Sequence, residues 1–114
     1  MSVKLTTRQV GDVTVVDAVG RITLGDGAST FRDNIRDLAN GGNKKLLLNL
    51  AEVSYIDSSG IGEMVAGFTK ITNIGGQVKL LNLTKRVQDL LQITKLYTVF
   101  EVFDDEAKAV RSFS

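Results

Sequence analysis

The feature that most constrains this chain is a junction between a buried strand and an amphipathic helix near its centre. Leu46–Leu50 is an apolar run interrupted only by Asn49, which is typical of a strand covered on both faces. Beyond Ile56–Gly62, apolar side chains recur at intervals of three and four, which places them on one face of a helix. That face comprises Ile61, Met64, Val65, Phe68, Ile71 and Ile74. We therefore predict that the strand leads directly into a helix, with Ser58 and Ser59 at the helix start.

A serine at this point has two ordinary uses. The first backbone N–H groups of a helix lack partners inside the helix and carry partial positive charge. Ser58 could therefore cap the helix, since serine is among the best N-cap residues. It could also carry a phosphate, which helix N-termini accommodate well. Position alone favours the cap.

The composition is that of one ordinary globular domain. Of the 114 residues, 43% are hydrophobic and 24% are charged, so we predict a single domain spanning residues 1–114. Lys and Arg number 14 and Asp and Glu 13, and this net charge of +1 argues against a nucleic-acid partner. No apolar run approaches the roughly 18 residues of a membrane span. Met1–Leu5 lacks the apolar segment of a signal peptide, so we expect a cytoplasmic protein without a membrane partner.

The residue types that the chain lacks exclude several classes of enzyme. It contains no His and no Cys, which excludes a Ser-His-Asp triad, a Cys nucleophile and a metal site built from His or Cys. An enzyme built from these residues would have to use carboxylates, Lys, Tyr or Ser with another base. We expect a protein that is not an enzyme, with no catalytic residues, no metal and no cofactor.

Three local patterns have both a chemical and a structural interpretation. Ser58 and Ser59 lie in the kind of turn that forms a Gly-x-Ser-x-Gly nucleophile elbow, but the first glycine and a histidine are missing. The glycines Gly60 and Gly62 fall short of a phosphate-binding loop, and more simply let the turn and the strand approach closely. The residues 104–106, Asp-Asp-Glu, could hold a divalent cation, but a solvated helix N-terminus is the simpler interpretation.

The first half of the chain predicts a hairpin, a helix and a central strand. Alternation at residues 3–9 and the β-rich run 13–20 predict antiparallel strands joined by a tight turn around Gly11. After a loop over residues 20–27, we expect Asp26 to cap a helix that ends at residues 40–43. Its inward face comprises Ala28, Phe31, Ile35 and Leu38. The central strand then spans residues 44–50, and residues 51–57 lead into the Ser58 junction.

The second half continues the alternation of strands and helices. We predict a strand over residues 77–83, a short helix capped by Thr84 and a strand over residues 99–103. The short helix faces inward through Val87, Leu90 and Leu91, and a final helix does so through Ala107, Val110 and Phe113. The order is β-β-α-β-α-β-α-β-α, which predicts an α/β fold with a mixed five-stranded sheet and about four packed helices.

The segment from Asn49 to Gly62, following an apolar strand, resembles the signature of anti-sigma factor antagonists, bacterial single-domain proteins of the STAS family. The Asp-Ser-Ser-Gly-Ile-Gly core at residues 57–62 carries most of this resemblance, and the element order and chain length agree with it. It implies a single STAS-like domain that works as a partner-switching regulator of transcription. In the family, the serine directly after the aspartate is phosphorylated, and that position is Ser58 here.

The resemblance also implies the partners. The unphosphorylated antagonist binds an anti-sigma factor serine kinase and thereby frees a sigma factor. Phosphorylation by that kinase ejects the antagonist, and a metal-dependent serine phosphatase resets the cycle. Because strand ends and helix starts converge at one edge of an open sheet, we expect the partner to contact the surface around Ser58. The expected partner-binding residues are Asp57, Ser58, Ser59, Gly60, Gly62, Arg21, Thr23 and Asp26.

One position departs from the family pattern. Many members carry Asp at the end of a Gly-x-[Leu/Ile]-Asp motif after the second strand, whereas this chain has Thr23 there. Asp26 is the nearest acidic residue that follows in the sequence. The departure bears on which kinase is matched and on any nucleotide binding, and it leaves Asp57 and Ser58 unaffected.

Two other functions remain open at this stage. One is a STAS subunit of another signalling assembly or of a lipid-transport assembly that never meets a sigma factor. The other, from the enzyme class, is a weak nucleotide-binding or nucleotide-hydrolysing domain. Phosphorylation of Ser58 by an anti-sigma kinase would favour the antagonist function over both.

Overall fold

The structure, a computed structural model, describes residues 3–113, so residues 1, 2 and 114 of the predicted domain lie outside it. The elements follow the predicted order, with one short 3₁₀ helix (η1) added. They are β1 (Val3–Val10), β2 (Val13–Ile22), α1 (Asp26–Asn40), β3 (Lys45–Ile56), α2 (Ser58–Asn73), β4 (Gln77–Leu81), α3 (Lys85–Ile93), η1 (Leu96–Thr98), β5 (Val102–Phe103) and α4 (Glu106–Ser112).

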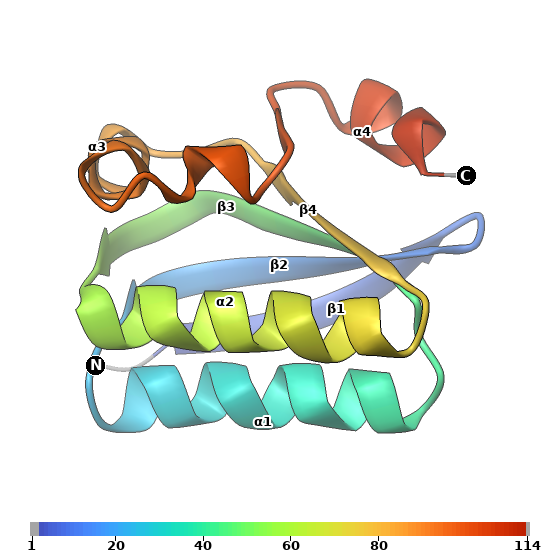
Figure 1. Ribbon diagram of the computed structural model, residues 1–114, viewed down its shortest axis with the longest axis horizontal. Coiled ribbons are helices and arrows are strands. Elements are labelled where there is room, and N and C mark those ends of the chain that lie inside the picture. Colours follow the sequence, from blue (N-terminus) through green and yellow to red (C-terminus); the bar gives the residue numbers. More distant parts are fainter. Residues whose placement is uncertain (1–2, 114) are drawn as a thin grey trace.

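The five strands form one mixed sheet in the order β1-β2-β3-β4-β5. β1 and β2 form the predicted antiparallel hairpin, with Val3 opposite Gly20 and Val10 opposite Val13. The pairs β2–β3, β3–β4 and β4–β5 are parallel. Figure 1 shows α1 and α2 side by side on one face of the sheet, and α3 and α4 on the other. This arrangement confirms the predicted fold class.

The central strand is longer than its apolar run suggested. The prediction ended it at Leu50, but β3 continues to Ile56. β3 stays paired with β2 up to its last residue, where Ile56 lies opposite Ile22. Two irregularities interrupt the register of this pairing, and they change which side chains face inward. Val53 and Ile56 are fully buried as a result, although the sequence around them does not alternate. The extension carries the chain straight to the start of α2.

The core confirms most of the predicted inward faces. In α2, Ile61, Met64 and Ile71 are buried, and Val65 and Phe68 pack partly buried against the same cluster. Ile74 is exposed because it lies just past the last helical residue. A second cluster beneath α4 comprises Val13, Val15, Leu47, Leu81, Ala109 and Phe113.

The C-terminal third departs most from the prediction. β4 ends at Leu81 because Asn82 adopts a left-handed backbone with φ of 58°. The fifth strand has only two residues instead of the predicted 99–103, because Val99 keeps helical backbone angles at the end of η1 and the Phe100 N–H still donates to the Leu96 carbonyl. In α4 the buried alanine is Ala109, whereas Ala107 is exposed. The helix begins at Glu106, the last residue of the acidic cluster, because Asp105 is its N-cap.

Candidate functional site

The start of α2 is capped by Asp57. Asp57 has extended backbone dihedral angles, and its Oδ1 accepts the Gly60 N–H at 3.0 Å. Ser58 is therefore the first residue of the helix, and the cap expected of Ser58 from position alone is wrong. The physical reason is that aspartate caps as well as serine does and lies one residue earlier, where the chain leaves β3.

The second oxygen of Asp57 reaches another segment of the chain. Its Oδ2 accepts the Leu24 N–H at 3.0 Å, and the Asp57 N–H donates to the Ile22 carbonyl at 3.4 Å. The Leu24 N–H, followed by the Gly60 N–H, holds the pKa of the Asp57 carboxyl below its usual range. One carboxylate thus joins the loop after β2 to the N-terminus of α2.

The two serines differ in exposure. Ser58 is exposed, and its hydroxyl forms no hydrogen bond with any residue between 3 and 113. Ser59 is half-buried. Because Asp57 supplies the capping oxygen, the Ser58 hydroxyl is free to react without removing a bond that holds the helix.

The two glycines of the junction have different surroundings. A Cβ at Gly60 would collide with the Ile22 carbonyl oxygen and would lie 2.7 Å from Ile56 Cγ1. A Cβ at Gly62 would meet nothing within 4 Å, and Gly62 is exposed. The expectation that both glycines permit close approach is therefore right for Gly60 and wrong for Gly62. Gly62 leaves the surface beside Ser58 open.

The loop after β2 lies against this junction. Thr23 is half-buried, and its carbonyl accepts the Ala28 N–H at 2.8 Å. Asp26 is the exposed first residue of α1 and does not cap the helix, contrary to expectation. Gly25 occupies the N-cap position with φ of 96°, a conformation that disfavours a residue with a Cβ.

Arg21 lies near two residues that the sequence did not single out. It is exposed at the end of β2, and its Cζ lies 5.5 Å from the centre of the Tyr55 ring. The Arg86 Cζ, from α3, lies 4.3 Å from the same ring. Pairing of Arg21 with Tyr55 across β2 and β3 follows from the sheet register, but only the folded chain shows that α3 places Arg86 there.

The predicted site residues thus divide into two groups. The first group surrounds the start of α2. It is held together by the hydrogen bonds of Asp57 to the Leu24 and Gly60 N–H groups and by the close approach of Gly60 to Ile22, and it comprises Asp57, Ser58, Gly60 and the Thr23 loop. Arg21 joins Tyr55 and Arg86 instead. The starts of α1 and α2 and the whole of α3 lie at the same end of the molecule (Figure 1).

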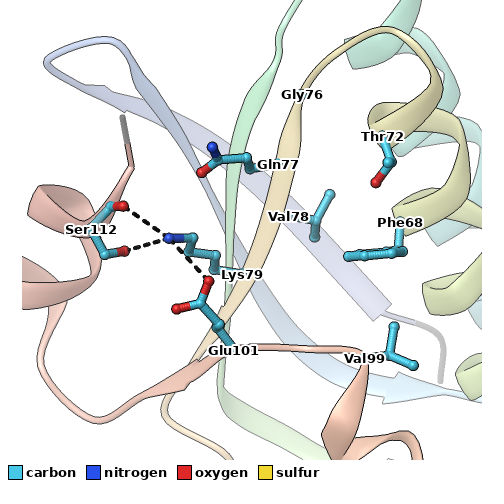
Figure 2. A pocket seen from close by; sticks show the side chains of 9 residues that line it. All are labelled: Phe68, Thr72, Gly76, Gln77, Val78, Lys79, Val99, Glu101 and Ser112. Carbon is cyan, nitrogen blue, oxygen red and sulfur yellow. Dashed lines mark hydrogen bonds and ion pairs between the residues drawn. The ribbon is translucent and has the colours of Figure 1, made fainter.

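A cavity of about 530 Å³ lies elsewhere, along the edge of β4 (Figure 2). It contains none of the predicted site residues. Lys79 lines it, but the Lys79 Nζ already donates to the Ser112 carbonyl at 3.0 Å and to the Ser112 Oγ at 2.9 Å, and pairs with Glu101 at 3.3 Å. Lys79 therefore anchors the end of α4.

The acidic cluster at residues 104–106 also has a structural role. Asp105 caps α4 by accepting the Lys108 N–H at 3.0 Å, and Glu106 pairs with Arg8. Within residues 3–113, no group of three or more carboxylates is arranged to hold a metal ion. Over the same residues, no helix has the length and apolar character required to cross a membrane.

Comparison with known proteins agrees with this fold. Residues 4–109 match the STAS domain family. The anti-sigma-B factor antagonist of Bacillus subtilis is 31% identical over 102 residues, which are 90% of this chain and 92% of the relative. A candidate anti-sigma factor antagonist from Thermotoga maritima superposes with a TM-score of 0.89 at 24% identity, covering 96% of this chain and 93% of that one.

The Bacillus anti-sigma factor antagonist SpoIIAA has the same fold in two states. Its unphosphorylated form gives a TM-score of 0.71 at 18% identity, covering 96% of each chain. Its phosphorylated form gives a TM-score of 0.75 at 19% identity, covering 96% of this chain and 98% of that one. The family match and the Bacillus subtilis relative together show that the chain belongs to the STAS domain family, and the relatives described above are anti-sigma factor antagonists.

Proposed function

We propose that this protein is an anti-sigma factor antagonist that is switched by phosphorylation of Ser58. In its unphosphorylated form it binds an anti-sigma factor that is also a serine kinase, and so releases a sigma factor in the cytoplasm. The kinase then transfers the γ-phosphoryl group of ATP to the Ser58 hydroxyl, which weakens the complex. A metal-dependent phosphatase removes the phosphate. The protein itself acts as a binding partner and not as an enzyme.

The observation that carries this proposal is the free hydroxyl of Ser58 beside an occupied cap. Ser58 is exposed at the first position of α2, while Asp57 accepts the Gly60 N–H that a capping serine would otherwise bind. The acceptor oxygen is therefore accessible to a kinase, and its modification removes no hydrogen bond of the fold.

The charge of the phosphate accounts for the switch. A phosphate adds about −1.5 to −2 charges at pH 7. At the N-terminus of its own helix this charge is tolerated, because the macrodipole and the free N–H groups favour an anion. Across a protein interface the same charge brings repulsion and desolvation, and a cost of about 3 kcal/mol weakens binding by roughly a hundredfold.

The junction is also held in place before the partner arrives. Asp57 ties the loop at Leu24 to α2, and Gly60 packs directly against Ile22. A preorganised surface loses less conformational entropy when it binds. The added charge can therefore control binding without a change in the fold.

The test is phosphorylation by a purified anti-sigma factor kinase from the same organism, with ATP and Mg²⁺, followed by intact mass and peptide mapping. We expect one phosphate on the wild-type chain, located at Ser58. Ser59→Ala is the matched control and should still be modified, whereas Ser58→Ala should not. Phosphate on Ser59, or no modification by any such kinase, would contradict the proposal.

A further inference from the structure

The aromatic ring of Tyr55 lies near two guanidinium groups from different elements. Arg21 of β2 and Arg86 of α3 lie 5.5 and 4.3 Å from the ring centre, measured from Cζ, within the range of a cation–π contact. Tyr55 is half-buried, so its ring is held by the fold, while both arginines are exposed. The cluster of Arg21, Tyr55 and Arg86 thus presents two positive charges on a fixed support.

No carboxylate neutralises these two charges within residues 3–113. By contrast, Arg8 pairs with Asp17 and Arg36 pairs with Asp33. Even Lys85, the residue before Arg86, pairs with Asp89 at 3.3 Å. Two like charges near one ring repel each other, and an anion bound by the two guanidinium groups would reduce that repulsion.

The cluster lies at the same end of the molecule as the proposed phosphorylation site, Ser58. Tyr55 is three residues before Ser58, at the carboxyl end of β3, and Arg21 precedes the loop that Asp57 holds. Figure 1 shows α3, which carries Arg86, at the end of the sheet where α2 begins. The partner-binding face predicted around Ser58 therefore continues onto α3.

We propose that Arg21 and Arg86, positioned by Tyr55, bind an acidic side chain of the protein partner. Guanidinium groups match carboxylates through paired N–H donors, and arginine and tyrosine are enriched among the residues that dominate interface energies. The inference rests on the proposed function only for the identity of the partner. The preference of the cluster for carboxylates is a property of this chain alone.

The first experiment tests that preference without the partner. A hexaglutamate peptide is titrated into the ¹⁵N-labelled protein, and the Nε–Hε signals of the arginines are followed by NMR. We expect saturable shifts at Arg21 and Arg86, with Arg111 of α4 as an exposed control that does not shift. Equal shifts at Arg111 would overturn the site. So would a tighter response to inorganic phosphate or ATP than to the peptide, which would assign the cluster to phosphoryl groups.

The second experiment measures affinity for the anti-sigma factor kinase. Arg86→Gln should weaken binding by at least tenfold and reduce its salt dependence, whereas Lys85→Gln, at the neighbouring position, should change affinity less than twofold. Tyr55→Phe should bind like the wild type, because the ring is kept, and Tyr55→Leu should resemble Arg86→Gln. Wild-type affinity in Arg86→Gln would refute the role in partner binding. If the wild type does not bind the anti-sigma factor kinase at all, the proposed function is refuted. The peptide titration would still show whether the cluster of Arg21, Tyr55 and Arg86 binds carboxylates.

Discussion

The Oδ2 atom of Asp57 accepts the backbone N–H of Leu24 at 3.0 Å, although the two residues are 33 positions apart in the chain. The other oxygen of the same carboxylate caps α2 through Gly60. The conformation of the loop after β2 and the start of α2 therefore depend on one side chain. This link places Ser58 and the Thr23 loop in a single surface.

Replacing Asp57 should destabilise the fold and also weaken the attachment of the Thr23 loop to the start of α2. Asp57→Ala removes an N-cap and an anchor for Leu24, and we expect a loss of about 1–3 kcal/mol in the free energy of unfolding. Asp57→Asn keeps a capping oxygen and should lose less. Urea unfolding at pH 7 measures both. If Asp57→Ala unfolds at the same urea concentration as the wild type, the carboxylate does not anchor the loop after β2 to the start of α2.

The contribution of the Asp57 charge should depend on pH. The pKa of this carboxyl is lowered in the folded protein, first by the Leu24 N–H, so folding favours the ionised form. The stabilisation is complete above the ordinary aspartate pKa of about 3.9 and is lost as pH falls through the lowered folded-state pKa. The difference in unfolding free energy between wild type and Asp57→Asn should thus be constant from pH 7 to about 5 and shrink below about pH 4. A difference that grows on acidification would contradict this assignment.

Gly60 and Gly62 form a matched pair that separates folding from binding. Gly60→Ala forces a Cβ against the backbone carbonyl of Ile22, so we expect a loss of at least about 2 kcal/mol, as for other overpacked sites. Gly62→Ala meets no atom within 4 Å and should stabilise α2 by about 0.5–1 kcal/mol. Thermal melts of both variants check the contrast. If Gly62→Leu also melts normally but binds the partner poorly, Gly62 lies in the interface.

Phe68 tests the packing of α2. The residue is partly buried and meets Phe100 edge to face, with ring centres 5.4 Å apart. Truncating a fully buried aromatic side chain to alanine costs about 3–5 kcal/mol. Because Phe68 is only partly buried, we expect Phe68→Ala to lose about 2–3 kcal/mol in the free energy of unfolding. A loss below about 1 kcal/mol in urea unfolding would place Phe68 outside the core.

Much of the fold could be predicted from local patterns. The spacing of Ile61, Met64 and Ile71 fixes the inward face of α2, and Thr84 caps α3 as expected by accepting the Val87 N–H at 3.4 Å. The C-terminal third could not be predicted as well, because its elements are too short for periodicity to distinguish them. β5 has two residues, and it exists as a strand only because Leu80 and Leu81 are there to pair with it.

The site was predictable where its residues are neighbours in the sequence. The positions of Asp57, Ser58 and Gly60 follow from the strand-to-helix junction, although the cap was assigned to the wrong one of the first two. Tyr55 and Arg86 were missed because their contact joins β3 to α3, and no local pattern reports a contact at that separation. The contact of Leu24 with Asp57 was missed for the same reason.

Ser58 itself is the sharpest test, since cap and switch predict opposite results. Ser58→Ala should unfold within about 0.5 kcal/mol of the wild type, because Asp57 is the cap, and it should still bind the anti-sigma factor. Ser58→Asp should fold normally at the helix N-terminus but bind at least about tenfold more weakly, because a carboxylate brings part of the phosphate charge into the interface. Titration calorimetry on folded variants, with Ser59→Ala as the control that binds like the wild type, measures the affinities. If Ser58→Asp binds like the wild type, negative charge is not the basis of the switch. If Ser58→Ala is clearly less stable and both variants bind normally, the role of Ser58 is structural.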